Sequence, residues 1–524
     1  MMKPRWIALS LLLVSTRLHA EPPPDFKARV EAVRTQVGVP GMAIAIVEGD
    51  RVTLAEGFGV RQLSASPRVD ADTLFLTGST GKAFTTAALA ILVDRGKIGW
   101  DDKVIDHMPW FQMYDPWVTR EMTIRDLLVH RSGLGLGAGD LLFVPRSNRT
   151  RKASVEALRY IQPSTSFRSG YAYDNILYMA AGQLIEEVSG KTWERFVADE
   201  ILTPLGMKNS TTGNAERFRN PNRAQPHTRL GGAVRGVGTL TRLEERGEAA
   251  ANSAPAGGLA ISANDMAKWL KVQLNGGAVP GGRRIFSTAA RDEMWTPVVI
   301  QPIDPRPAEL QATQPMFYTY ALGWDVQDYR GSKIVWHAGA MWGFLTTVVI
   351  IPEKNVAFSI MINSEDGEVI RGFMYELLDH YLGLPPGNWP EKYAAYKKRR
   401  IAEVLAALPA PLPPGDKVGP SLPLERYVGD YVDPWYGKIS VSGGKSDLRI
   451  DFTESPGMAG TLEHYRFDTF ITRFADPSLE PAYVTFALSA DGSIERVTMR
   501  AVSPLADFSY DYQDLMFKPA GPAK

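Results

Sequence analysis

The chain contains the stretch Thr73-Leu74-Phe75-Leu76-Thr77-Gly78-Ser79-Thr80-Gly81-Lys82, which is followed by an apolar run from Ala83 to Val93. The apolar run predicts a buried helix that Thr77 or Ser79 caps. Residues three apart lie on one face of a helix, so Ser79 and Lys82 are expected to bring a hydroxyl and an amine within hydrogen-bond reach. A lysine deprotonates a serine only where burial or a nearby cation favours the neutral amine. The stretch therefore predicts a nucleophile beside a base.

The Ser-x-x-Lys pattern is weak evidence when it stands alone. The chain contains a second copy, Ser442-Gly443-Gly444-Lys445, within residues that are typical of a hairpin turn. Nothing around this second copy predicts a dry site or a partner group. The assignment to Ser79 therefore depends on residues elsewhere in the chain.

Composition restricts the kinds of function that the chain can have. The 524 residues suffice for two or three domains, and the formal net charge is zero. Such a balance predicts neither a nucleic-acid partner nor binding to an anionic membrane surface. The absence of cysteine excludes thiol catalysis and disulfide bridges. The histidines show no close metal-ligand spacing, so we expect no metal and no cofactor.

The N-terminus has the layout of a signal peptide. Lys3 and Arg5 precede an apolar run from Trp6 to Val14, and the small residue Ala20 stands before Glu21. The apolar run is too short to span a bilayer. We therefore expect residues 1–20 to be removed from a periplasmic or secreted protein that keeps no membrane-spanning segment.

The remainder divides into two expected domains. A helix is predicted at 26–37, and residues 41–47 and 51–55 predict a β-hairpin. Four further segments predict an antiparallel meander, namely 320–324, 334–337, 345–351 and 356–363. Six prolines between 409 and 423 are typical of a stiff linker. The period-two runs beyond them predict a small all-β barrel or sandwich. The expected domains are thus 21–400 and 425–524, joined by a linker at 401–424.

Three separated motifs supply the context that the Ser-x-x-Lys pattern needs. They are Ser79-Thr80-Gly81-Lys82, Tyr173-Asp174-Asn175 and His337-Ala338-Gly339. In order and spacing they resemble the motifs of the serine β-lactamase and penicillin-binding-protein superfamily. The stretches His130-Arg131-Ser132-Gly133 and Pro255-Ala256-Gly257-Gly258-Leu259 also resemble segments of that superfamily. The resemblance covers roughly residues 26–385 and implies an α+β fold, in which helices and an all-helical subdomain flank an antiparallel sheet.

The resemblance implies a role for each motif residue in acyl transfer. Ser79 would attack the substrate carbonyl and Lys82 would take its proton, while Tyr173 would share that role and return a proton to the leaving group. Asn175 would hydrogen-bond the substrate or Lys82. We therefore expect Ser79, Lys82 and Tyr173 to be the catalytic residues.

The strand motif is expected to bind the substrate. His337 occupies the position of the superfamily's strand lysine, and Gly339 would let the substrate pair against the strand without a side-chain clash. The backbone N–H groups of Ser79 and Ala340 would form the oxyanion hole.

Departures from the superfamily pattern bear on the substrate. Tyr173 in place of a serine indicates the branch of class C β-lactamases, DD-peptidases and family VIII esterases. His337 in place of lysine gives a side chain that is largely neutral at pH 7, and so a poorer anchor for a substrate carboxylate. We therefore expect cleavage of amide bonds in small or unusual peptides, including D-amino-acid-containing or linearised microcystin-like peptides.

Two alternatives stay open at this point. One is a carboxylesterase or weak β-lactamase of the same fold, acting on ester or lactam substrates by the same mechanism. The other is a non-catalytic protein that binds peptidoglycan or peptides. The oligomeric state is also open.

Overall fold

The computed structural model describes residues 21–245, 252–279, 281–408 and 418–521. The predicted signal peptide and residues 409–417 of the predicted linker lie outside the described residues. Within the described ranges, no helix has the length and apolar character that crossing a membrane requires.

An antiparallel sheet of eight strands forms the centre of the larger domain, in the order β2-β1-β12-β11-β10-β9-β8-β7. Its strands are β1 (Gly41–Glu48), β2 (Arg51–Gly59), β7 (Val299–Ile300), β8 (Tyr318–Tyr320), β9 (Asp325–Tyr329), β10 (Ser332–Met341), β11 (Phe344–Ile351) and β12 (Val356–Ile362). The hairpin and the meander predicted from the sequence are both present. The predicted strand at 320–324 is wrong, because the chain turns at Gly323, which has a φ of +79° and separates β8 from β9.

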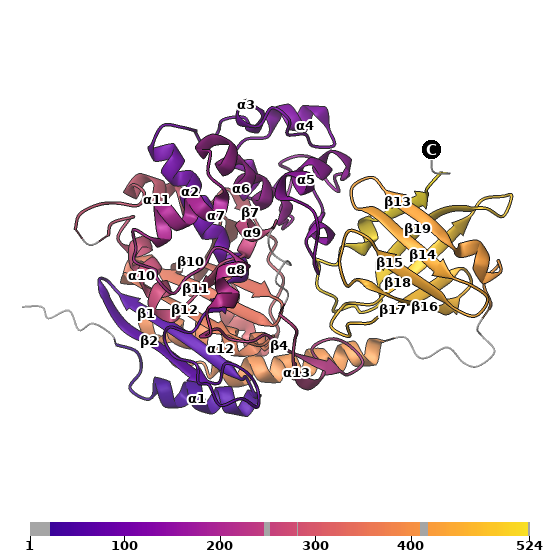
Figure 1. Cartoon of the computed structure of the whole chain (residues 1–524). Coiled ribbons are helices and arrows are strands. Elements are labelled where there is room, and N and C mark those ends of the chain that lie inside the picture. Colours follow the sequence, from indigo (N-terminus) through magenta and orange to yellow (C-terminus); the bar gives the residue numbers. More distant parts are fainter. Residues whose placement is uncertain (1–20, 246–251, 280, 409–417, 522–524) are drawn as a thin grey trace, which may run out of the picture.

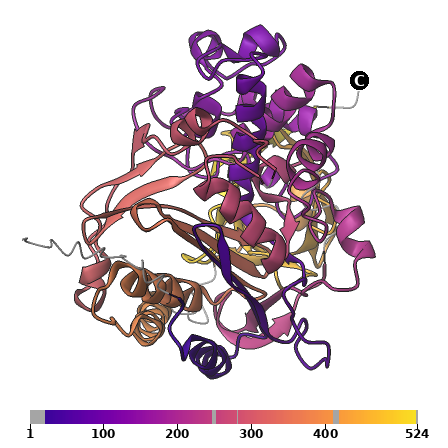
Figure 2. The ribbon, with the colours of Figure 1, turned by 90° about the vertical axis from the view of Figure 1, so that its left-hand side faces the viewer.

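Both faces of the sheet are apolar and both are covered by helices (Figure 2). Ala43 and Ala45 of β1 belong to a core cluster on one face, and Ile44 and Ile46 belong to a cluster on the other. This alternation follows from the period-two geometry of a strand. Helices α1 (Phe26–Val37), α12 (Gly367–Leu382) and α13 (Trp389–Ala407) lie on the second face. Helices α2 (Lys82–Asp94), α10 (Ala263–Leu274) and α11 (Thr288–Met294) lie on the first.

A helical subdomain adjoins the first face (Figure 1). It contains α3 (Val104–His107), α4 (Pro116–Glu121), α5 (Arg151–Glu156), α6 (Ile176–Ser189) and α7 (Trp193–Val197). The connection back to the sheet contains α8 (Asn214–Arg219), α9 (Ala254–Gly257) and two short sheets, β3–β6 (Phe75–Leu76, Ala260–Ile261) and β4–β5 (His227–Gly231, Gly238–Arg242). The α+β expectation is therefore confirmed.

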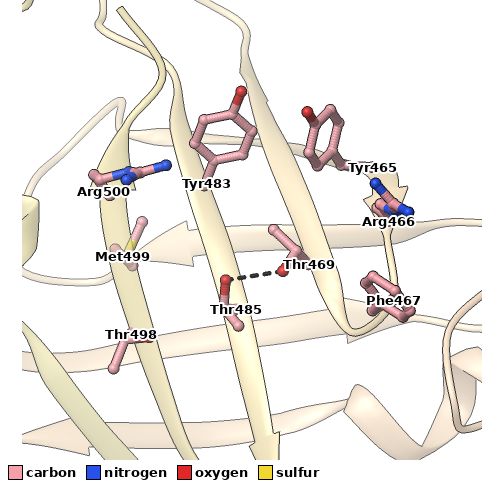
Figure 3. Close-up of a pocket in the computed structure, with 9 residues that line it drawn as sticks. All are labelled: Tyr465, Arg466, Phe467, Thr469, Tyr483, Thr485, Thr498, Met499 and Arg500. Atoms are coloured by element: carbon pink, nitrogen blue, oxygen red, sulfur yellow. Dashed lines mark hydrogen bonds between the residues drawn. The ribbon is translucent and has the colours of Figure 1, made fainter. Parts of the chain in front are cut away.

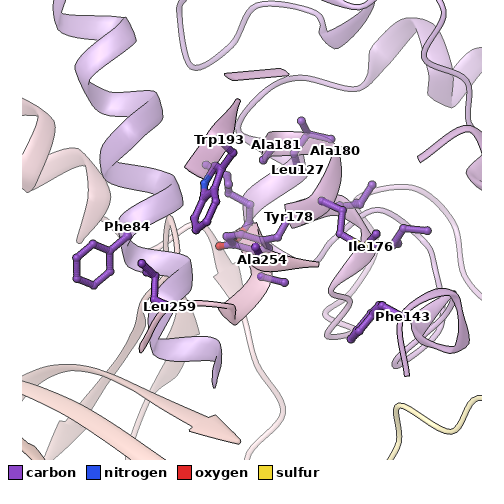
Figure 4. Close-up of a cluster of buried hydrophobic side chains, with 14 of the residues drawn as sticks. Phe84, Leu127, Phe143, Ile176, Tyr178, Ala180, Ala181, Trp193, Ala254 and Leu259 are labelled. Atoms are coloured by element: carbon purple, nitrogen blue, oxygen red, sulfur yellow. The ribbon is translucent and has the colours of Figure 1, made fainter. Parts of the chain in front are cut away.

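The apolar core between α2 and α6 fixes the position of the Ser79 segment (Figure 4). Phe84 of α2 stacks on Trp269 of α10 with ring centroids 3.9 Å apart. On the other side of α2, Trp193 donates a hydrogen bond from Nε1 to Thr85 Oγ1 over 3.0 Å. All four of these side chains are buried, so α2 is held from two sides.

The C-terminal residues form a closed barrel of eight antiparallel strands, which confirms the predicted all-β domain. The strands are β13 (Gly429–Asp433), β14 (Gly437–Gly443), β15 (Leu448–Phe452), β16 (Ala459–Arg466), β17 (Thr469–Phe474), β18 (Ala482–Leu488), β19 (Ile494–Ala501) and β20 (Met516–Pro519). Consecutive strands pair, and β13 closes the barrel against β20. Closure leaves no free edge for unwanted pairing.

The helix before the barrel differs from the sequence-based boundary. Helix α13 continues to Ala407, into the residues expected to belong to the linker. Residues 389–407 are rich in alanine, lysine, glutamate and arginine, which favour helix, and the prolines begin only at Pro409. The proline-rich part of the linker thus begins after residue 401, the boundary expected from the sequence.

Candidate active site

Ser79 and Lys82 lie at the start of α2, where the backbone passes from a 3₁₀ turn, η1 (Gly78–Gly81), into the α-helix. Lys82 Nζ lies 3.2 Å from Ser79 Oγ. Neither Thr77 nor Ser79 caps the helix with its side chain, contrary to the prediction. Thr77 Oγ1 instead donates a hydrogen bond to Leu259 O over 3.0 Å, which joins η1 to the segment before β6.

The Lys82 side chain is completely buried, and two carbonyl oxygens accept hydrogen bonds from its amine. Asn175 Oδ1 lies 2.6 Å and Ala256 O lies 3.0 Å from Nζ. The amine also lies over the rings of Tyr173 and Tyr178, 4.7 and 4.9 Å from their centroids. Burial lowers the pKa of Lys82 to about 7, against the opposing charges of nearby carboxylates.

The neutral form of Lys82 has a defined orientation in this setting. A neutral amine has two N–H donors and one lone pair, and carbonyl oxygens can only accept. The contacts to Asn175 Oδ1 and Ala256 O therefore use both N–H groups. The lone pair is left facing Ser79 Oγ, which is the orientation that a general base requires.

Tyr173 lies in the extended segment that precedes α6, with its ring against His130 at a centroid separation of 4.2 Å. Its hydroxyl oxygen is buried and makes no hydrogen bond of normal geometry within the described chain. Burial raises the pKa of Tyr173 well above its usual value, while the neighbouring Ser79 hydroxyl acts in the opposite direction. The phenol is thus a proton donor at neutral pH.

Asn175 stands at the N-terminus of α6 and connects Lys82 to a residue that the sequence did not single out. Its Nδ2 donates a hydrogen bond to Asp140 Oδ2 over 2.9 Å, while its Oδ1 accepts from Lys82. Asp140 is completely buried, and burial raises its pKa to about 7.

His337 lies on β10, close to the other motifs, but its ring is already hydrogen-bonded on both sides. Nδ1 lies 2.5 Å from Ala338 O, an acceptor, so Nδ1 carries the proton. Nε2 then accepts from the Tyr320 hydroxyl over 2.8 Å. Burial lowers the pKa of His337 to about 3, so the ring is neutral. It is also 4% exposed, which makes it a poor anchor for a carboxylate.

The backbone of η1 packs directly on the edge of β10. A Cβ atom at Gly78, which has a φ of +52°, would lie 2.6 Å from Ala340 N. A Cβ atom at Gly339 would lie 2.1 Å from Thr77 O and 3.0 Å from Ser79 N. Glycine at both positions therefore allows the backbone nitrogens of Ser79 and Ala340 to lie on adjoining segments, as an oxyanion hole needs.

The edge of β10 beside η1 is not covered by another strand. The pairing of β10 with β9 ends at Trp336↔Asp325, and from His337 onward β10 pairs with β11 alone among the described strands. This leaves one side of the His337-Ala338-Gly339 segment for η1 and for a substrate.

Three contributors to the site were not predicted from the sequence: Asp140, Tyr320 and the carbonyl of Ala256. Asp140 follows a glycine-rich stretch and belongs to none of the three motifs. Tyr320 was assigned to a strand and given no role. The Pro255-to-Leu259 segment had been noted only as part of the resemblance, which could have pointed to its backbone. In each case the contact is made between segments far apart in the sequence.

The hollow shown in Figure 3 lies on the outer face of the barrel, away from these motifs, and has a volume of about 380 Å³. Tyr465 and Tyr483 line it with ring centroids 5.1 Å apart, and Arg500 lies over the Tyr483 ring. Its lining, drawn from the described residues, contains no carboxylate, histidine or lysine. The hollow therefore offers no general base, and the Ser79 region remains the candidate active site.

A buried lysine beside a serine, at the junction of an antiparallel sheet and a helical subdomain, defines a serine hydrolase of the penicillin-binding type. The family model described as Beta-lactamase matches residues 26–375, so the chain belongs to that family. A domain of unknown function (DUF3471) matches residues 414–519, which contain the barrel.

Comparison with individual proteins agrees with this assignment. The unguisins hydrolase ungD' of Aspergillus campestris is 30% identical over 441 residues, covering 80% of this chain and 77% of that protein. The octameric penicillin-binding protein homologue from Pyrococcus abyssi superimposes with a TM-score of 0.56 at 22% identity, over 91% of this chain and 98% of that one. The D-amino acid amidase from Ochrobactrum anthropi gives a TM-score of 0.54 at 22% identity, over 68% and 98%. The chain is therefore a serine hydrolase of this family.

Proposed function

We propose that the chain is an exported peptidase or amidase that cleaves amide bonds of small or unusual peptides through a covalent acyl-enzyme on Ser79. One observation carries the proposal. Lys82 is fully buried with both amine N–H groups directed at carbonyl oxygens, which leaves its lone pair facing Ser79 Oγ at 3.2 Å. A binding protein would need no such arrangement.

In the first step Lys82 Nζ takes the proton of the Ser79 hydroxyl, and Oγ bonds to the carbonyl carbon of the substrate. The carbonyl π bond opens and places a negative charge on the oxygen. The N–H groups of Ser79 and Ala340 stabilise that oxyanion.

In the second step the carbonyl re-forms and the C–N bond breaks, with a proton passing to the leaving amine nitrogen. Tyr173 is the donor, because its buried phenol stays protonated at neutral pH. Lys82, which holds the serine proton, lies over the Tyr173 ring and returns that proton to the phenol. Water then attacks the carbonyl carbon of the acyl-Ser79 ester while Lys82 takes its proton. The C–Oγ bond breaks, that proton passes from Lys82 to Ser79 Oγ, and the acid is released.

The substrate class follows from the strand. His337 is neutral and buried, so it provides no permanent positive charge for the carboxylate of a β-lactam or of a peptide C-terminus. This favours peptides or amides recognised by shape and by backbone pairing with Gly339. The similarity to a hydrolase named for unguisins supports small or unusual peptides as substrates. The fold shared with a D-amino acid amidase makes amides of D-residues a class to test, and the proposal includes linearised microcystin-like peptides.

A substrate panel tests this proposal. The full chain is incubated with matched pairs of D- and L-aminoacyl amides, a linear D-residue-containing peptide, a cephalosporin and p-nitrophenyl esters, and kcat/KM is measured for each. We expect kcat/KM for amides with D-residues to exceed that for the cephalosporin. Ser79→Ala should abolish turnover of every substrate. Turnover of esters alone would replace the peptidase assignment by a carboxylesterase of the same mechanism.

A further inference from the structure

A loop of the barrel reaches the turn that carries Asp140. The loop lies between β19 and β20, and its residue Asp511 accepts hydrogen bonds from two backbone N–H groups of that turn. Gly139 N lies 2.7 Å and Leu141 N lies 3.0 Å from the two oxygens of the Asp511 carboxyl. Asp511 and Asp140 are both completely buried, so the two domains are joined here without intervening solvent.

Two neighbours of Asp511 extend this contact to the motif residues. Ser509 Oγ donates a hydrogen bond to Asp140 Oδ2 over 2.7 Å. The ring of Phe508 meets the ring of Tyr173 edge-on, with centroids 5.9 Å apart. Phe508 is 41% exposed, so it lies at the protein surface rather than in the core.

The contacts form a continuous chain from the barrel to the nucleophile. Ser509 donates to Asp140 Oδ2, and Asn175 Nδ2 donates to the same oxygen. Lys82 donates to Asn175 Oδ1 and faces Ser79. Each link runs from a donor to an acceptor, so the direction of the Asn175 amide is set from both of its ends.

We propose that Asp140 and Ser509 are positioning residues that hold the Asn175 amide with its oxygen towards Lys82, and that the barrel is therefore a working part of the active site. The inference rests on the proposed Ser79 chemistry and deepens it.

The orientation matters because a reversed amide would disable the base. With Asn175 Nδ2 towards Lys82, the lone pair of the neutral amine would accept from that N–H group. One of the amine's own N–H groups would then face Ser79 Oγ, and the serine would have no proton acceptor. Reversal would also place Asn175 Oδ1 against the Asp140 carboxylate, two acceptors in a buried position. The ionised carboxylate of Asp140, which predominates above its pKa of about 7, thus selects the productive orientation.

The charge of Asp140 also acts on Lys82. Burial is the main influence that lowers the pKa of Lys82, and the negative charges of Asp140 and Asp174 oppose it. Loss of the Asp140 charge should therefore lower the pKa of Lys82 further. The titratable groups that surround this amine are Asp140, Asp174, Tyr173, Tyr178, His130 and His337.

Modification of Ser79 by a fluorophosphonate ester reports directly on the base and needs no knowledge of the natural substrate. The second-order rate is measured for the full chain across about pH 5 to 9, together with the melting temperature. We expect Asp140→Asn to slow the reaction about 10–100-fold and Ser509→Ala about 3–10-fold, as for loss of one charge-assisted and one weaker hydrogen bond. The pH inflection of Asp140→Asn should fall below that of the wild type, without a lower melting temperature.

Ser503→Ala is the matched control. Ser503 lies in the same loop and its Oγ accepts a hydrogen bond from Leu505 N, so its loss perturbs the loop without touching Asp140. It should react at the wild-type rate.

If wild type is modified at Ser79 but Asp140→Asn matches it in rate and pH inflection, the inference is wrong and the proposed function stands. Asp140→Asn could instead react more slowly while its melting temperature falls and its pH inflection stays at the wild-type value. That result would give Asp140 a structural role only and would also overturn the inference. A wild type unreactive at Ser79 would overturn the proposed function itself.

Discussion

The chain contains two Ser-x-x-Lys tetrapeptides whose surroundings differ in every respect that matters for chemistry. Ser79 and Lys82 lie at the start of a buried helix, and the lysine is completely enclosed. Ser442 lies at the end of strand β14, and Lys445 follows in the turn, both exposed. In the helix the two side chains meet at 3.2 Å, whereas a strand and turn give no such common face. The Ser-x-x-Lys sequence therefore does not make a serine reactive by itself. The reactivity comes from the surrounding structure.

The largest expected effect separates the two serines. Ser79→Ala should lower amide hydrolysis by about 10⁴-fold or more, because the covalent route is lost. Ser442→Ala should leave the rate unchanged. Initial rates with the best amide of the substrate panel measure both variants, and a loss of activity in Ser442→Ala would reverse the assignment.

The lysines should differ almost as strongly. Lys82→Ala removes the proton acceptor and should cost about 10³–10⁴-fold in kcat. Lys445→Ala should have the activity of the wild type. Steady-state kinetics at pH 8 compare them, and a Lys82→Ala enzyme that retains most of its kcat would show that another group, such as Tyr173, serves as the base.

A pair of glycines extends the comparison to the oxyanion hole. In Gly78→Ala the new Cβ atom would press on Ala340 N, 2.6 Å away, and should lower kcat about 10²–10³-fold. Gly444→Ala adds a Cβ atom with nothing within 4 Å and should be silent. Thermal unfolding of both variants serves as the control for misfolding, and normal kcat in a folded Gly78→Ala enzyme would remove this strand edge from the mechanism.

The pH dependence follows from the burial of Lys82. Its pKa of about 7 means that the base is protonated, and therefore inactive, below that pH. The kcat/KM should rise with pH, pass an inflection near 7 and reach a plateau, with a value at pH 6 about tenfold below the plateau. A profile that is flat between pH 6 and 9 would exclude a neutral Lys82 as the base.

The smallest expected effect concerns His337. His337→Ala should raise KM about 3–10-fold and change acylation less, because the ring supports the strand edge through Tyr320 and Ala338. His464 is a half-buried histidine of the barrel, so His464→Ala is the matched control and should change neither constant. Rapid-mixing measurement of acylation and binding distinguishes the two effects, since a larger fall in acylation would show that His337 takes part in proton transfer.

Local pattern predicted most of the fold from the sequence. The helix at 26–37, the hairpin after it and the barrel strands follow from apolar periodicity, which is a property of neighbouring residues. The end of a strand at Tyr320 did not follow, because a single left-handed glycine turns the chain there. Residue 401, the expected start of the linker, lies inside α13 instead, and that helix ends at Ala407.

The motif residues of the site were recognisable, but their partners were not. Ser79, Lys82, Tyr173, Asn175 and His337 lie close together, as the family resemblance implied. Asp140 and Ser509 are 369 positions apart in the chain and carry no motif. Their contact depends on how the barrel packs against the helical subdomain. The sequence around either residue does not predict that contact.

The most direct test of the account is mass spectrometry of the intact protein after reaction with a fluorophosphonate, followed by peptide mapping. We expect a single adduct on the peptide that contains Ser79, formed faster as the pH rises through 7 and absent from Ser79→Ala. An adduct on any other residue, or one that persists in Ser79→Ala, would contradict the claim that this serine and its buried lysine form the active site.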